Sequence, residues 1–192
     1  IKRELKLAII ENKYRIGVKY VNQNRLLTLR GIILLLEDLA CRHSDMVGFC
    51  INDTFKTNLS WVLLNWKIKI LKEANYGSTV TVKTWSRDTN KLYTYRDFEI
   101  YDENNNLICI ASSKWVLLST KTGHITQITD EIRNAYNPEN KTVFEEPEIS
   151  KLIEPSNANE TFSFRVNRRD IDINNHMNNL YYLDYALEAL PE

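Results

Sequence analysis

Three polar residues near the end of the sequence stand at every second position: Asp172, Asn174 and His176. If the backbone is extended there, their side chains project to one side, because successive residues of a strand point to opposite faces. A carboxylate, an amide and an imidazole in one pocket can hold or deprotonate a water molecule and donate hydrogen bonds to an oxyanion. None of the three is a strong nucleophile for acyl transfer, so the set favours direct attack by water.

A helix is expected to begin at Asn178 or Asn179, and its dipole would favour negative charge developing near His176. A purely structural interpretation stays open, because Asp and Asn side chains also cap helices and turn the chain. A metal site is disfavoured, because no second histidine or cysteine lies close to His176 in the sequence.

Three further residues are candidate contacts for a substrate. Arg168 and Arg169 directly precede the polar segment, and they could meet a phosphate or an acidic partner or simply be solvated. Trp61 falls in a strand-like segment and could line an apolar cavity, although aromatic residues on strands are more often core. His43 is expected at the C-terminal end of a helix, where its charge would suit the dipole, and His124 in a solvated turn.

The composition excludes several classes of protein. Lys+Arg and Asp+Glu both number 25, and this balance argues against a general nucleic-acid binder. The 3 cysteines form no C-x-x-C pair, so neither a disulfide framework nor a zinc knuckle is indicated, and a reducing cytoplasm is expected. The longest apolar run, Gly31 to Leu36, is too short for membrane insertion.

Hydrophobic periodicity predicts a long helix followed by an antiparallel sheet. After a first strand over Tyr14–Val21, Thr28 is expected to cap a helix that runs to Arg42 and is apolar on most sides. Segments that alternate with period two and are separated by short turns follow at 59–73, 78–85, 92–101 and 107–119. Short connections favour antiparallel neighbours, so a meander curled around the helix is predicted.

The pattern restarts near the end of the chain. Residues 139–159 have little periodicity and hold Pro147 and Pro155, as expected of a linker. A strand over 161–169, a loop and a helix follow, so that strand, loop and helix occur twice. An offset of 148 aligns Val18 with Val166. That alignment places Asn24 over Asp172 and Thr28 over His176, so the first copy lacks the ionisable pair.

Several stretches together resemble the acyl-[acyl carrier protein] thioesterases. "DIDINNHMNNLYYLDYALEALP" is similar to the signature of that family's second domain. "TLRGIILLLEDLACRHSDMVGF" is similar to its first central helix, and the stretch from "WVLLNWKIKI" to "KTGHI" is similar to its first sheet. The resemblance covers nearly the whole chain from about residue 13.

The resemblance implies an α+β protein of tandem hot-dog folds, each a long helix wrapped by a curved antiparallel sheet. It implies an acyl-binding domain over 1–138, a linker over 139–159, and over 160–192 the strand, catalytic loop and helix that begin a catalytic domain. The implied reaction is hydrolysis of fatty acyl-[acyl carrier protein] in fatty acid biosynthesis, with Asp172, Asn174 and His176 catalytic. No cofactor is implied, because phosphopantetheine enters as part of the substrate.

The sequence departs from the family pattern after the last helix. The family has further strands there and a further catalytic acid, to which Glu188 does not correspond by position; Glu188 is treated as structural. We therefore expect the 192 residues alone to be unstable or inactive. Two alternatives stay open for the function, an acyl-CoA thioesterase and a hot-dog module that binds acyl groups without cleaving them. Either a monomer or a homodimer fits, since two hot-dogs in one chain can pair internally.

Overall fold

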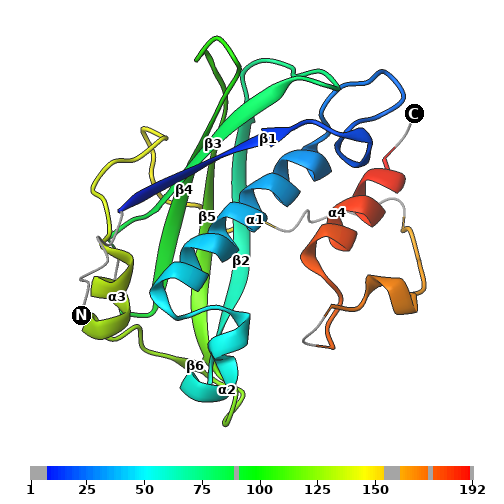
Figure 1. Cartoon of the computed structure of the whole chain (residues 1–192). Coiled ribbons are helices and arrows are strands. Elements are labelled where there is room, and N and C mark those ends of the chain that lie inside the picture. Colours follow the sequence, from blue (N-terminus) through cyan, green and yellow to red (C-terminus); the bar gives the residue numbers. More distant parts are fainter. Residues whose placement is uncertain (1–7, 89–90, 154–160, 173–174, 191–192) are drawn as a thin grey trace. The chain divides into compact units, whose positions relative to one another are not determined.

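The computed structural model of the protein describes residues 8–88, 91–153, 161–172 and 175–190 (Figure 1). The chain divides into two compact units, Ile1–Ile149 and Ser150–Glu192. No helix in the described part of the chain is long and apolar enough to cross a membrane.

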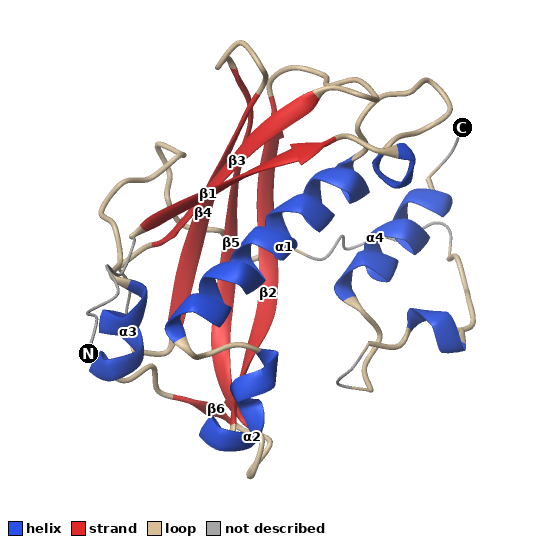
Figure 2. Cartoon of the chain, viewed as in Figure 1, coloured by secondary structure: helices blue, strands red, loops and turns tan. Residues whose placement is uncertain are grey.

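The first unit contains an antiparallel sheet with the strand order β1-β3-β4-β5-β2, and β6 adds to it by pairing with β5 (Figure 2). The strands are β1 (Ile9–Arg15), β2 (Leu59–Ile70), β3 (Thr79–Ser86), β4 (Tyr93–Tyr101), β5 (Leu107–Ser119) and β6 (Ile125–Thr126). The four alternating segments of the sequence therefore become β2 to β5, and the prediction of antiparallel pairing is confirmed.

The predicted meander is wrong at β2. This strand pairs with β5, from Leu59 opposite Ser119 to Ile70 opposite Cys109, rather than with β3. The connection between β2 and β3 is held instead by the loop that precedes the long helix, since the Leu27 N–H donates to the Ala74 carbonyl at 2.9 Å. The free edge of β3 is then occupied by β1.

The first strand also begins and ends earlier than predicted. β1 covers Ile9–Arg15, and the residues that follow it form a 3-10 turn at Val18–Tyr20. The reason lies in the partner strand, because β3 begins at Thr79, directly opposite Arg15. Ile16 still bonds to the turn before β3, with its N–H donating to the Ser78 carbonyl and its carbonyl accepting from the Gly77 N–H, both at 2.8 Å, and the chain then leaves the sheet.

The long helix α1 (Leu29–Val47) lies across one face of the sheet (Figure 1). The Thr28 hydroxyl accepts a hydrogen bond from the Gly31 N–H at 2.9 Å, which confirms the predicted cap. The buried residues on α1 cover a broad face of the helix, but Asp38, Cys41 and Arg42 are exposed, so the predicted burial on most sides is wrong. Buried residues of α1 form one core with apolar side chains of the sheet. This core includes Leu35, Leu36 and Leu39 of the helix and Val82, Phe98 and Ile100 of the sheet.

Two short helices were not predicted, α2 (Thr54–Thr57) and α3 (Asp130–Tyr136). The sequence signal for α3 is present in retrospect. Thr129 caps it by accepting from the Ile132 N–H at 3.4 Å, and Asn137 ends it in the left-handed conformation.

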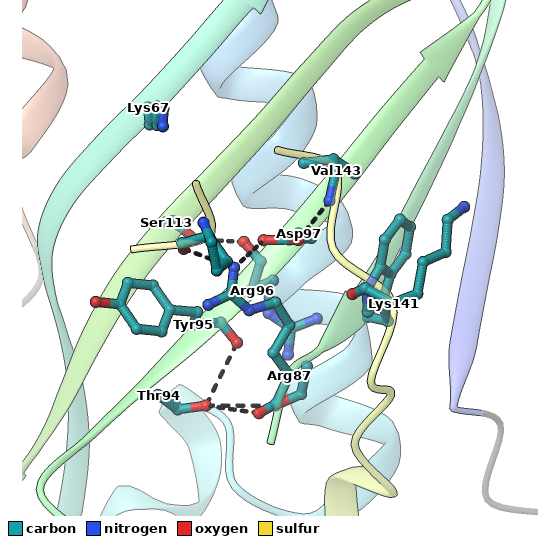
Figure 3. Close-up of polar contacts among 12 residues, drawn as sticks. Lys67, Arg87, Thr94, Tyr95, Arg96, Asp97, Ser113, Lys141 and Val143 are labelled. Atoms are coloured by element: carbon teal, nitrogen blue, oxygen red, sulfur yellow. Dashed lines mark hydrogen bonds and ion pairs between the residues drawn. The ribbon is translucent and has the colours of Figure 1, made fainter. Parts of the chain in front are cut away.

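The first half of the predicted linker is hydrogen-bonded to the sheet. Figure 3 shows residues of this strap, defined as 139–149, beside polar side chains of β4. The Val143 N–H donates to Asp97 Oδ2 at 3.0 Å, and Lys141 Nζ lies 2.6 Å from Glu99 Oε1. Arg87 Nη1 donates to the Pro147 carbonyl at 2.8 Å. Burial raises the pKa of Asp97, which is fully buried, although Ser112, Arg87 and the Val143 amide oppose that shift.

The carboxyl of Glu37 on α1 should make the stability depend on pH. Burial raises its pKa from 4.5 to about 7, against the opposing charge of Arg30. The folded state therefore binds a proton that the unfolded state has lost, so the contribution to stability is complete below pH 4.5 and disappears as the pH rises through about 7.

We expect Glu37→Gln to unfold like the wild type at pH 4.5 and to be more stable by about 3 kcal/mol at pH 8. Urea unfolding of both proteins across this range measures the difference. A difference that stays constant with pH would contradict the expectation.

The second unit has little regular structure in its described residues. A 3-10 turn covers Arg168–Asp170, and helix α4 covers Asn179–Glu188, so the predicted helix start at Asn179 is confirmed. The strand predicted over 161–169 is not formed in the described chain. An extended segment becomes a strand only when it pairs with another, and none of the described strands pairs with this one.

Candidate active site

Asp172 and His176 are hydrogen-bonded to each other at the two ends of a tight turn. The Asp172 N–H donates to the His176 carbonyl at 2.8 Å, and the His176 N–H donates to Asp172 Oδ1 at 3.3 Å. Asn175 has a φ of 60°, the left-handed conformation that Asn tolerates well in turns. Ile171 and Met177 close the turn as a bridge.

The extended backbone considered for residues 172–176 from the sequence is not what the structure shows, because a hydrogen-bonded turn joins Asp172 to His176. The turn still brings Asp172 close to the backbone of His176, because the Asp172 N–H donates to the His176 carbonyl and the His176 N–H donates to the Asp172 carboxylate. His176 is exposed and Asp172 half-buried, so water can reach the imidazole. Asn174 lies outside the described residues.

The start of α4 follows directly on the turn. Asn178 is its N-cap, with the side-chain oxygen accepting from the Leu180 N–H at 2.9 Å. Asparagine is among the preferred residues at this position, so Asn178 has a structural explanation. The positive end of the helix dipole therefore begins within the same short segment as His176.

The first unit contains the same turn without an ionisable side chain at either of the two positions equivalent to Asp172 and His176. The Asn22 N–H donates to the Leu26 carbonyl at 3.0 Å, and the Leu26 N–H donates to Asn22 Oδ1 at 3.1 Å. Arg25 has a φ of 63°, as Asn175 has 60°. The two copies are therefore 150 positions apart, not 148 as predicted. Asn22 and Leu26 correspond to Asp172 and His176.

This internal repeat separates the structural role of the turn from a chemical one. An asparagine oxygen is sufficient to accept the turn's side-chain hydrogen bond, and a leucine is sufficient at the second position. The carboxylate and imidazole of the second unit are therefore not required by the backbone. The hydrogen bonds of the turn do not explain why these two residues are ionisable. A reactive role for the pair would explain it.

The predicted substrate contacts lie in different surroundings. Arg168 and Arg169 are exposed in the 3-10 turn before the loop, and Arg169 Nε lies 3.6 Å from Asp170 Oδ1. Trp61 lies on β2 in the first unit, where its indole N–H donates to the Tyr136 hydroxyl at 3.0 Å. Its polar atom is therefore used inside an aromatic cluster of that unit.

The prediction for His43 is wrong. It is only 1 % exposed, and its Nδ1 lies 3.0 Å from Nη1 of Arg96, which is also buried. The Tyr136 ring meets His43 edge-on, with ring centroids 5.4 Å apart. A second positive charge beside a buried guanidinium is unfavourable, so this position suits a neutral histidine.

Two further predictions concern the other candidates. His124 is exposed in its turn, as expected. Cys109 is buried, which raises the pKa of its thiol to about 12 and makes it unreactive, whereas Cys41 is exposed and not buried as predicted. Among the described residues, no group of three or more His, Cys, Asp or Glu side chains is placed to bind a metal ion.

Comparison with known families identifies the sequence. Residues 8–136 match the acyl-ACP thioesterase N-terminal domain, and residues 153–192 match the acyl-ACP thioesterase C-terminal domain. The chain belongs to the acyl-ACP thioesterase family. The turn at Asp172 and His176 lies within the segment that matches the C-terminal domain.

Two plant thioesterases are among the relatives of this chain. Oleoyl-acyl carrier protein thioesterase 2, chloroplastic, from Arabidopsis thaliana is 30% identical over 97% of this chain and 54% of its own length. Palmitoyl-acyl carrier protein thioesterase, chloroplastic, from Cuphea hookeriana is 27% identical over 95% and 47%. The chain thus spans about half the length of the curated relatives it matches.

Solved structures of the family share its fold. An acyl-ACP thioesterase from Bacteroides thetaiotaomicron superimposes with a TM-score of 0.82 at 24% identity, covering 96% of this chain and 74% of the other. The 12:0-ACP thioesterase from Umbellularia californica gives 0.83 at 22% identity, covering 97% and 76%. The predicted α+β hot-dog fold with an antiparallel sheet is confirmed.

Proposed function

We propose that the full-length protein hydrolyses the thioester of fatty acyl-[acyl carrier protein], releasing free fatty acid and carrier protein in fatty acid biosynthesis. The observation that carries this proposal is the Asp172–His176 turn. It lies in the family's C-terminal domain and places an ionisable pair where the equivalent turn of the first unit has Asn22 and Leu26.

In the proposed reaction, His176 acts as general base, and Asp172 orients the turn and balances the charge that forms on the imidazole. Water attacks the thioester carbonyl carbon and gives one proton to His176. The C–S bond then breaks, and that proton passes to the departing thiolate, so the products are the carboxylic acid and the free thiol. Asn174 is proposed to bind either the water or the carbonyl oxygen, and the family's further acid to assist.

The thioester is already activated, so positioning and oxyanion stabilisation supply much of the rate. We propose that the first unit holds much of the acyl chain, with Trp61 among its contacts, and that the second carries out hydrolysis, the two being joined by the linker at 139–159. Arg168 and Arg169 are exposed cations suited to the phosphate of phosphopantetheine or to an acidic carrier. A cytoplasmic location fits the free cysteines Cys41, Cys50 and Cys109.

The carrier is tested by comparing two thioesters of equal acyl length. We expect kcat/KM for acyl-ACP to exceed that for acyl-CoA by about tenfold or more, because carrier contacts far from the reacting bond add binding energy to the transition state. The assay is release of free fatty acid by the full-length protein. Equal or higher kcat/KM with acyl-CoA would make the protein an acyl-CoA thioesterase, and tight acyl-ACP binding without fatty acid release would make it a sensor.

A further inference from the structure

A buried carboxylate lies at the base of the candidate active-site turn. Asp170 is 0% exposed. Its Oδ2 accepts hydrogen bonds from the Asn167 backbone N–H and from the Tyr185 hydroxyl, both at 2.7 Å. The Tyr185 oxygen also accepts from Asn167 Nδ2 at 2.9 Å. These residues, Asn167, Asp170 and Tyr185, form a closed cluster, called the clamp below.

The clamp joins the turn to the helix that follows it. Asp170 precedes Asp172 by two residues, and its carbonyl accepts the N–H of Asn178, the N-cap of α4, at 2.8 Å. Tyr185 lies on α4 itself, and the Phe164 ring stacks on it with centroids 3.8 Å apart. Asp170 therefore joins the entrance of the turn to α4 at two places, through its carbonyl at the N-cap and through its carboxylate at Tyr185.

The carboxylate is held in its charged form despite its burial. Burial alone would raise the pKa of Asp170, but the hydrogen bonds from Asn167 and Tyr185 hold it below its ordinary value. Oδ1 is also buried and has no hydrogen-bond donor among the described residues; Arg169 Nε lies 3.6 Å away. A buried carboxylate that accepts hydrogen bonds on only one oxygen destabilises the folded state, so its presence needs a functional explanation.

The backbone fold of the turn does not explain why a carboxylate is buried at Asp170. In the first unit, the Thr28 N–H donates to the Tyr20 carbonyl at 2.9 Å, the counterpart of the bond from Asn178 to Asp170. At the three clamp positions, 150 residues earlier, that unit has Gly17, Tyr20 and Leu35, with no carboxylate among them. The same turn thus forms without a clamp in the copy that also lacks the ionisable pair.

We infer that Asp170, acting through Tyr185 and Asn167, is a positioning residue that holds the Asp172–His176 turn in one orientation against α4. The inference rests on the proposed function, because it gives the clamp a role in the same reaction. A displacement of about 1 Å at a reacting group can cost about 10²-fold in rate, which is the kind of error that a rigid base prevents.

Two variants of the full-length protein test the clamp. Tyr185→Phe keeps the ring that stacks on Phe164 and removes one hydrogen bond, so we expect kcat with acyl-ACP to fall about tenfold while KM stays within about twofold. Asp170→Asn keeps the size but removes the charge, and its kcat should fall further. Tyr182→Phe is the matched control, since Tyr182 lies on the same helix with its side chain exposed, and its kcat should not change.

The readout separates positioning from stability. Rates are measured well below the melting temperature, with the folded fraction determined in the same samples. Wild-type kcat in folded Tyr185→Phe and Asp170→Asn, with lowered melting temperatures alone, would overturn the inference. If His176→Leu is inactive in that case, the proposed function stands without the clamp; full activity of His176→Leu would remove the proposed site itself.

Discussion

Replacing His176 by Leu in the full-length protein is expected to lower kcat for acyl-ACP hydrolysis by about 10²–10⁴-fold, the usual contribution of a positioned general base. Leucine is chosen because Leu26 occupies the same place in the first unit, so the turn should form normally. Circular dichroism and the melting temperature should therefore match the wild type.

Asp172→Asn is expected to cause a loss of the same order for the same reason. Asn22 Oδ1 accepts the turn's hydrogen bond at 3.1 Å, as Asp172 Oδ1 does at 3.3 Å, so the variant keeps the geometry and loses only the charge. His124→Ala, which removes an exposed histidine from a different turn, is the control and should retain wild-type kcat. Near-normal hydrolysis by both site variants would reject the assignment.

Gly31→Ala should be the most damaging small substitution in the first unit. A Cβ at this position would collide with the Tyr20 carbonyl oxygen and lie 2.9 Å from Leu27 Cδ1. That carbonyl already accepts the Thr28 N–H and cannot move away cheaply. Overpacking of this kind costs about 3 kcal/mol, of which the better helix propensity of Ala returns about 1 kcal/mol.

We therefore expect Gly31→Ala to lower the free energy of unfolding by about 2 kcal/mol, measured by urea denaturation. Gly17→Ala is the matched control, because a Cβ there meets nothing within 4 Å and its φ of −95° suits any residue. Its stability should stay within about 0.5 kcal/mol of the wild type. Equal effects of the two substitutions would contradict the close approach at Gly31.

Local pattern was enough to predict most elements of the first unit. The alternation of residues 107–119 reproduces β5, and Thr28 marks the start of α1. The position of β2 could not be predicted in this way, because the connection after it is anchored by a distant residue, Leu27, whose N–H donates to the Ala74 carbonyl. Strand partners are a tertiary property, and spacing along the chain carries little of it.

The sequence predicted which residues lie in the candidate site, but it did not predict how they are arranged. Asp172 and His176 were found by chemical type, but period-two spacing suggested an extended segment where a hydrogen-bonded turn exists. The clamp was missed because Asp170 looked like one more polar residue of the loop. Nothing local indicates that its partner is Tyr185, fifteen residues further along, or that the carboxyl is buried.

We propose that the turn of the second unit, and not the rest of the fold, carries out hydrolysis. The most direct test is a single-turnover experiment with the double variant Asp172→Asn, His176→Leu, which places the first-unit residues at the two ends of the turn. The expected result is acyl-ACP binding within about twofold of the wild type, with release of fatty acid slowed by about 10²-fold or more. Release at the wild-type rate would contradict the account.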